Sequence, residues 1–200
     1  MLSRIKRIVL RLVFRKRKHV HKWVQVSREP AITCSLCGKV LAYRVVYECD
    51  ICGAKDCMID VLENYSFVND TVTQVNPHYQ KVKLITLCRE CYPKFVKKVE
   101  EIKKELKKYS TGFKVYVTKN VAQVTFRDIK SLIEWIQQFI IYISEPCEGY
   151  IEDSKEKVFG LEFYAVAKYP SGIIYKILVP YREILNELKH GSNVGEEVVV

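Results

Sequence analysis

The residues with the clearest chemistry in this 200-residue chain are its cysteines, because seven of the eight lie between positions 34 and 91. Six of them form three Cys-x-x-Cys pairs, and a seventh is followed three positions later by an aspartate. The candidate metal ligands are Cys34, Cys37, Cys49, Cys52, Cys57, Asp60, Cys88 and Cys91. Thiolates separated by two residues curl around one soft cation, usually Zn²⁺, and a carboxylate oxygen is also an accepted zinc ligand. Eight ligands predict two tetrahedral zinc sites, with one ion as the minimum.

Two further residues bear on these sites. His78 follows Pro77 in an expected turn, and it is the replacement ligand if Asp60 does not bind metal. Cys147 is isolated after Pro146 and is expected to be a packed or free thiol rather than a ligand.

A disulfide framework is the competing interpretation of eight cysteines, and it requires a secreted chain. The N-terminal segment has only two short apolar runs, at residues 8–10 and 12–14, which Arg11 separates and four basic residues follow. Such a segment is too short and too charged for a signal peptide or a membrane span. We therefore expect reduced thiols in a cytoplasmic protein.

Positive charge is concentrated at the N-terminus. Residues 1–28 carry ten basic side chains and no acidic one, whereas the rest of the chain carries equal numbers of each, so the whole formal charge of +10 lies in this arm. Apolar residues recur every three or four positions from Leu2 to Val13, which predicts a basic amphipathic helix. An arm of this kind favours a polyanion, because each neutralised phosphate releases counterions. The candidate nucleic-acid-binding residues are Arg4, Arg7, Arg11, Arg15, Lys16, Arg17, Lys18 and Lys22.

Three surfaces can receive such an arm: nucleic acid, an anionic membrane surface, or the body of the protein itself. His19, His21 and Trp23 are candidates for stacking on bases, although a tryptophan after a helix is more often a packing anchor. We favour nucleic acid over the other two surfaces.

The cysteine pairs can be divided between two ions in more than one way. The pairs that begin at Cys34 and Cys49 are each followed by glycine, which permits the turn of a zinc knuckle. The pair that begins at Cys88 opens a predicted helix, whose N-terminus favours thiolates. In a treble-clef finger one knuckle shares its ion with such a helical pair, and of the two knuckles we favour the one at Cys49.

Residues 49–57 read Cys-Asp-Ile-Cys-Gly-Ala-Lys-Asp-Cys and resemble the central part of the FYVE zinc-finger family, whose core consists of a Cys-x-x-Cys-Gly knuckle, three further residues and a second Cys-x-x-Cys pair. The pairs at 34–37 and 88–91 fall where that family places its outer pairs. The resemblance covers residues 34–91 and implies a cross-brace, as in RING and PHD fingers: the first and third pairs hold one ion, and the second and fourth hold the other. Residues 45–48 lack the basic His-rich stretch with which FYVE domains grip phosphoinositides, so phosphoinositide binding is not expected.

The whole pattern predicts an α+β protein in which a small zinc-stabilised treble-clef-type module precedes a β-β-α-β-β-α unit. Residues 40–47 are rich in branched and aromatic side chains and predict a strand, and Asn76-Pro77 predicts a turn. The expected domains are a basic arm at 1–30, a zinc module at 31–110, an α/β unit at 111–191 and a flexible tail at 192–200. The apolar face of the helix expected after Cys91 consists of Phe95, Val99, Ile102, Leu106 and Tyr109.

Alternation and helical periodicity place the elements of the α/β unit. Two strands are expected before residue 127, one of them at 113–117, and an apolar helix is expected from Ile129 to Ile143. A hairpin follows around Pro170-Ser171-Gly172, and a helix at 181–190 closes the unit.

The sequence contains none of the common catalytic motifs, and zinc sites saturated with protein ligands have no open position for a reactive water. We therefore expect structural zinc and no enzyme activity. The preferred function is binding of nucleic acid, RNA or the ribosome more than DNA, through the basic arm. The alternative is a RING- or FYVE-like adaptor for a protein partner, with residues 113–190 as the binding face, and a membrane-surface protein ranks third.

Overall fold

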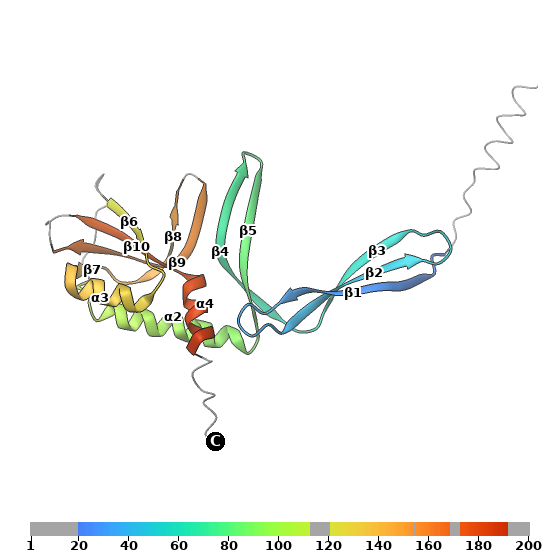
Figure 1. Cartoon of the computed structure of the whole chain (residues 1–200), viewed down its shortest axis with the longest axis horizontal. Coiled ribbons are helices and arrows are strands. Elements are labelled where there is room, and N and C mark those ends of the chain that lie inside the picture. The colour runs from blue at the N-terminus through green and yellow to red at the C-terminus, as the bar shows by residue number, and fades with distance from the viewer. Residues whose placement is uncertain (1–19, 113–120, 154, 169–172, 192–200) are drawn as a thin grey trace, which may run out of the picture. The chain divides into compact units, whose positions relative to one another are not determined.

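The computed structural model shows a mixed α+β protein, which confirms the α+β part of the expected fold (Figure 1). The chain divides into two compact units. The smaller unit contains Tyr43–Asp60 and the described part of Met1–Glu29, and the larger contains Pro30–Ala42 and the described part of Val61–Val200. The domain boundaries expected from the sequence stay a prediction. The structure describes residues 20–112, 121–153, 155–168 and 173–191.

The two turns of a three-stranded sheet contain the candidate knuckles. Its strands are β1 (Trp23–Thr33), β2 (Val40–Cys49) and β3 (Lys55–Val61), paired in the order β1-β2-β3. The strand predicted at 40–47 is confirmed. Residues 23–30, which we expected in a helical arm, instead belong to β1. The β-branched and aromatic side chains of Trp23, Val24 and Val26 favour extended backbone, and pairing with β2 satisfies the polar groups of that backbone.

A seven-stranded sheet forms the body of the larger unit. The hairpin of β4 and β5 reverses at Asn76-Pro77, as predicted. The sheet continues through β9 and β10 to β6, which pairs in parallel with β10. Its strands are β4 (Tyr65–Asn76), β5 (Tyr79–Cys88), β6 (Val121–Thr125), β7 (Ile140–Ile143), β8 (Cys147–Glu152), β9 (Glu156–Ala167) and β10 (Ile174–Pro180).

Strand β9 is the centre of this sheet because four strands pair with it. Its first residues pair with β4 and its later residues with β10 along one edge, while β8 and then β7 occupy the other edge. Gly160 lies where β8, β9 and β10 meet, and a Cβ there would lie 2.1 Å from the carbonyl oxygen of Val179. Only glycine fits this close approach of two backbones.

Helix α2 (Cys91–Lys107) follows β5 directly, and its buried face is the predicted one. Phe95, Val99, Ile102 and Leu106 are all buried, and Tyr109 packs against the same core. The N-cap residue Glu90 makes no side-chain hydrogen bond to the first turn of the helix. The first N–H groups of α2 therefore keep their partial positive charge close to Cys88 and Cys91.

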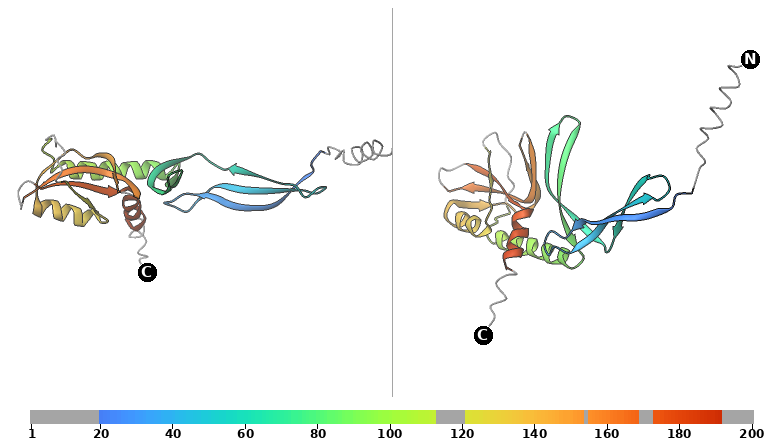
Figure 2. Two further views of the ribbon diagram at one scale, coloured as in Figure 1. Left: turned by 90° about the horizontal axis from the view of Figure 1, so that it is seen from above. Right: turned by 45° about the vertical axis from the view of Figure 1, so that its right-hand side comes forward.

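Helices α2, α3 (Ile129–Phe139) and α4 (Tyr181–Gly191) share one continuous core with the larger sheet, and their course can be followed in Figure 2. Asp128 caps α3, because its carboxylate accepts hydrogen bonds from the N–H groups of Lys130 and Ser131 at 3.1 Å each. The hairpin of β9 and β10 and the closing helix are confirmed.

The predicted β-β-α-β-β-α order is wrong within the described residues, which have two additional strands between α3 and β9. Helix α3 ends at Phe139, and the run Ile-Ile-Tyr-Ile forms strand β7 on β9. β-Branched and aromatic side chains favour this outcome once a sheet edge is available for pairing. Residues after Pro146 add strand β8. The strand predicted at 113–117 and the tail at 192–200 lie outside the described residues.

Candidate metal centres

Four cysteine sulfurs meet in the larger unit, at the junction of the β1–β2 turn, the end of β5 and the start of α2. All four Sγ atoms lie within 4.8 Å of one another. The Sγ atoms of Cys37 and Cys88 are 3.9 Å apart. Two sulfurs bound to one tetrahedral zinc ion, each by a bond of about 2.3 Å, would be about 3.8 Å apart. The four-cysteine cluster consists of Cys34, Cys37, Cys88 and Cys91.

The backbone of the first knuckle shapes this cluster. Gly38 has φ of +74°, which glycine adopts without strain, and its N–H donates to the carbonyl oxygen of Cys34 at 2.9 Å. Ser35 ties the knuckle to β5, because its N–H donates to the carbonyl oxygen of Thr86 at 2.7 Å and its hydroxyl accepts from the N–H of Thr86 at 3.0 Å. The N–H of Cys88 donates to the sulfur of Cys34 at 3.4 Å.

The four-cysteine cluster is largely shielded from water, since Cys37 alone among its members is exposed. Burial by itself would raise the pKa of the Cys34 thiol, but N–H groups of Cys37, Cys88 and Leu36 outweigh burial and lower that pKa to about 7. Burial and the adjoining thiols raise the pKa of Cys91. The N–H of Lys39 favours the thiolate of Cys37, yet burial and the neighbouring Cys34 raise its pKa. The Cys34 thiolate thus forms easily, whereas a cation would favour the thiolates of Cys37 and Cys91.

A second group, in the smaller unit, combines two cysteines with a histidine that precedes β1. Its three ligand atoms lie within 4.8 Å of one another, and Sγ of Cys52 is 3.5 Å from Nδ1 of His21. Cys49 is buried, whereas Cys52 and His21 are exposed. We call His21, Cys49 and Cys52 the three-ligand cluster.

The second knuckle has the same internal hydrogen bonds as the first. Gly53 has φ of +68°, and its N–H donates to the carbonyl oxygen of Cys49 at 2.8 Å. The N–H of Asp50 donates to the carbonyl oxygen of Lys22 at 3.0 Å, and the two side chains form an ion pair of 3.5 Å. These contacts hold the backbone next to His21 beside the knuckle.

The structure corrects the expected pairing of the cysteines. The helical pair at Cys88 joins the knuckle at Cys34, so both the favoured partition and the cross-brace partition are wrong. The physical reason lies in the strands: the bonds between Ser35 and Thr86 fasten the first knuckle to β5. The knuckle at Cys49 closes the β2–β3 turn and is fastened instead to Lys22.

Two predicted ligands belong to neither group of the described residues. Cys57 is an exposed residue of β3, and its N–H donates to the carboxylate of Asp56 at 2.8 Å. Asp60 forms an ion pair of 2.8 Å with Arg28, whose guanidinium also lies over the ring of Tyr43.

The other sequence candidates are placed as follows. His78 lies in the β4–β5 turn, where its N–H donates to the side chain of Asn76 at 3.0 Å, and it belongs to neither group. Cys147 forms no disulfide, and neither does any other cysteine of the described residues. Among the candidate nucleic-acid-binding residues only Lys22 is described, and it is exposed; the seven between Arg4 and Lys18 lie outside the described residues.

Sequence reasoning missed His21 as a possible ligand. We considered it only for base stacking, and its ring does stack on Trp23, with centroids 4.9 Å apart. The available signal was the position of a histidine directly before a strand that precedes two knuckles.

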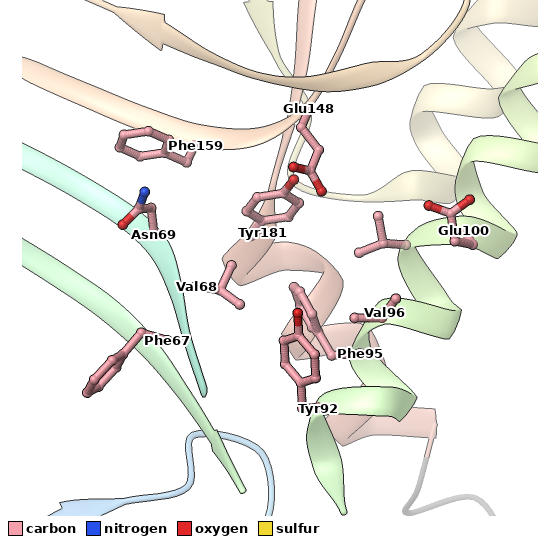
Figure 3. A pocket seen from close by; sticks show the side chains of 11 residues that line it. Phe67, Val68, Asn69, Tyr92, Phe95, Val96, Glu100, Glu148, Phe159 and Tyr181 are labelled. Atoms are coloured by element: carbon pink, nitrogen blue, oxygen red, sulfur yellow. The ribbon is translucent and has the colours of Figure 1, made fainter. Parts of the chain in front are cut away.

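The larger unit also contains a cavity of about 310 Å³ between β4, α2, β8, β9 and α4 (Figure 3). Tyr181 and Glu148 face one another at its wall. The Tyr181 hydroxyl is buried without a well-formed hydrogen bond, and burial together with the negative charge of Glu148 raises its pKa. The cavity is lined by Phe67, Val68, Asn69, Tyr92, Phe95, Val96, Val99, Glu100, Glu148, Phe159 and Tyr181.

No family model, curated protein or solved structure matches this chain. The two groups of cysteine and histidine side chains can hold metal ions. Among the helices of the described ranges, none has the length and apolarity needed to cross a membrane.

Proposed function

We propose that this protein is a non-catalytic, zinc-stabilised nucleic-acid-binding protein, with RNA or the ribosome preferred over DNA. The proposal rests mainly on one observation. The acid-free basic arm leads directly into residues that are hydrogen-bonded to a knuckle whose cysteines could hold a metal ion. The arm would supply the electrostatic contacts, and the metal-held strands would supply a rigid support for it.

The four-cysteine cluster fits a structural zinc ion. Four thiolates saturate a tetrahedral ion, which leaves no position for a catalytic water. A site of this kind contributes folding free energy, on the order of 10 kcal/mol in zinc peptides. Here the ion would join the β1–β2 turn to the first turn of α2, in the manner of a treble-clef finger.

The charge of the smaller unit supports the binding of an external polyanion. Several of its described cations are matched by acids, since Lys22 pairs with Asp50, Arg28 with Asp60 and Lys55 with Glu48. Residues 1–18, by contrast, contain no acidic side chain that could pair with their own cations. Phosphates of a nucleic acid would provide the missing counter-charges, and exposed aromatic residues such as Trp23 and Tyr92 would be available for stacking on unpaired bases.

A charge-neutralised variant tests this function against a matched control. The first variant replaces the seven basic residues from Arg4 to Lys18 that we named as candidates with glutamine. The control variant replaces seven lysines of the α2 region with glutamine, namely Lys94, Lys97, Lys98, Lys103, Lys104, Lys107 and Lys108.

Affinity for single-stranded and double-stranded RNA and DNA would be measured across a range of salt. We expect the arm variant to lose most of the affinity and of the salt dependence, because log K falls by about 0.7 per phosphate contact per decade of salt on single strands. The α2 variant should bind like the natural protein. Equal losses in the two variants, or the absence of a salt slope in the natural protein, would contradict the proposal.

The cavity favours a second candidate function, binding of a protein partner through a lysine or arginine side chain. Exposed Phe67 and Tyr92 would cover the aliphatic part of such a side chain, and Glu148 makes no ion pair among the described residues. Aromatic faces beside carboxylates favour cations.

N-acetylarginine amide and its uncharged analogue N-acetylcitrulline amide would distinguish this function. The arginine probe should shift the NMR signals of Tyr92 and Tyr181, and the citrulline probe should leave them unchanged. The substitution Glu148→Gln should abolish the response. Identical responses to the two probes would show that the cavity does not select a cation.

A further inference from the structure

We infer that the three-ligand cluster is a second zinc site, in which His21 is a ligand and one coordination position is exchangeable. The ion would fasten the chain at His21 to the knuckle of the β2–β3 turn. This inference concerns metal and local structure, so it does not require that the arm binds nucleic acid.

The ligand distances fit a single small ion. A sulfur and an imidazole nitrogen on one tetrahedral zinc ion, with bonds of about 2.3 and 2.05 Å, would lie about 3.6 Å apart. The observed distance between Sγ of Cys52 and Nδ1 of His21 is 3.5 Å. All three ligand atoms, including the buried sulfur of Cys49, lie within 4.8 Å of one another.

The second knuckle repeats the first bond for bond. In each, the N–H of the first cysteine donates at 2.8 Å to the carbonyl oxygen five residues later, on Lys39 or Ala54. In each, the glycine N–H returns to the first cysteine, at 2.9 or 2.8 Å. The same type of turn therefore occurs twice in the chain, each time with a different partner segment.

Contacts made by the two residues after His21 hold it beside the second knuckle. The carbonyl oxygen of Lys22 accepts from the N–H of Asp50, and the Lys22 and Asp50 side chains form an ion pair. On the other side of Lys22, Trp23 stacks on the His21 ring. The imidazole is thus held near both sulfurs by the two residues that follow it, which lowers the entropy lost when an ion binds.

The two clusters differ in closure. The four-cysteine cluster has four protein ligands and three buried members, whereas the three-ligand cluster, as far as the structure describes it, has one buried member. A water molecule or another small ligand can complete the coordination of an exposed three-ligand ion. Such an ion exchanges with solvent more easily than one enclosed by four thiolates.

Metal counting on matched histidine variants tests the site. The natural protein, purified with zinc, should contain two ions per chain, and His21→Ala should contain one. His78→Ala is the control, because His78 is an exposed histidine that belongs to neither group, and this variant should retain two ions. His21→Cys should also retain two, since it restores a ligand at that position.

Release of zinc to a coloured chelator adds a kinetic measurement. The natural protein should release one ion in a fast phase and one in a slow phase. His21→Ala should lose the fast phase, while His78→Ala should keep both. Hydrogen exchange at the Asp50 amide should become faster in His21→Ala, because the ion no longer holds Lys22 beside it.

Two results would overturn the inference. One is a natural protein that binds a single ion, and the other is a His21→Ala protein that keeps two ions with both release phases. If the ions are counted as expected but the arm variant binds RNA normally, the metal site stands and the proposed function fails.

Discussion

The two knuckles can be compared within one chain. Their turns have the same geometry, but different segments contribute the remaining candidate ligands. Each turn has the same glycine conformation and the same two backbone hydrogen bonds. The first meets two cysteines from the end of β5 and the start of α2 in a mostly buried setting, and the second meets one exposed histidine. A knuckle alone therefore does not determine whether an ion bound there would be enclosed, because the partner segment supplies the remaining candidate ligands and the burial.

The partner also determines what the ion would stabilise. In the larger unit the four-cysteine cluster adjoins the core, because Cys34, Cys88 and Cys91 belong to the same apolar cluster as the buried face of α2. In the smaller unit the ion would secure only the short segment before β1. We therefore expect loss of the first ion to unfold far more structure than loss of the second.

The largest effect should come from Cys88→Ser. Removing one thiolate from the four-cysteine cluster should weaken metal binding and leave three crowded thiols, two of them in the core. We expect a loss of roughly 5 kcal/mol or more, a large part of the stability of a typical domain. Thermal unfolding monitored by circular dichroism would measure it. Cys147→Ser is the control and should change the melting temperature little, and a Cys88→Ser protein that melts like this control would show that the cluster does not stabilise the fold.

A smaller and more local effect should follow from Cys52→Ser. The variant should lose one ion and retain the other, with little change in the melting of the larger unit. Faster amide exchange should be confined to the β2–β3 turn and residues 21–23. Cys57→Ser provides the comparison on the neighbouring strand, since Cys57 belongs to neither metal group, and should stay within about 0.5 kcal/mol of the natural protein. Global unfolding of Cys52→Ser would show that the two clusters do not differ in how much structure they stabilise.

Much of the fold followed from local patterns. The strand at 40–47, the turn at Asn76-Pro77 and the buried face of α2 were all predicted, because side-chain periodicity and turn residues act over short distances. The end of α3 was not predicted correctly. A run of isoleucines after Phe139 suits a helix or a strand, and the free edge of β9 decided between them.

The metal groups show the same division between local and distant information. The knuckles were visible because cysteine spacing and glycine are local signals. Their partners were not, because pairing depends on contacts between Ser35 and Thr86 and between Asp50 and Lys22, which are far apart in sequence. Asp60 was favoured by spacing, yet its carboxylate lies beside Arg28.

Substitution of the knuckle glycines should have equal and moderate effects on the backbone. Gly38→Ala and Gly53→Ala each place a Cβ on a residue with positive φ, which costs about 1–2 kcal/mol. A Cβ at Gly38 would meet no atom within 4 Å, and at Gly53 the nearest would be a Glu48 side-chain oxygen at 3.8 Å, so conformational strain is the main cost in both. Chelator competition should therefore show similar losses of metal affinity at the two sites. A much larger loss at one site would mean that the turns, and not only their partners, differ.

The smallest effect should come from Asp60→Asn, which separates the two roles considered for this carboxylate. The Asp60 and Arg28 side chains are each more than two-fifths exposed, and exposed ion pairs contribute about 0–1 kcal/mol. If Asp60 only pairs with Arg28, the variant should keep both ions and lose less than about 1 kcal/mol in urea unfolding. Arg28→Gln should then show a comparable or somewhat larger loss, because Arg28 also lies 4.4 Å from the ring centroid of Tyr43. If Asp60→Asn releases an ion and Arg28→Gln does not, Asp60 is a metal ligand after all. The second knuckle would then share its ion with both Asp60 and His21.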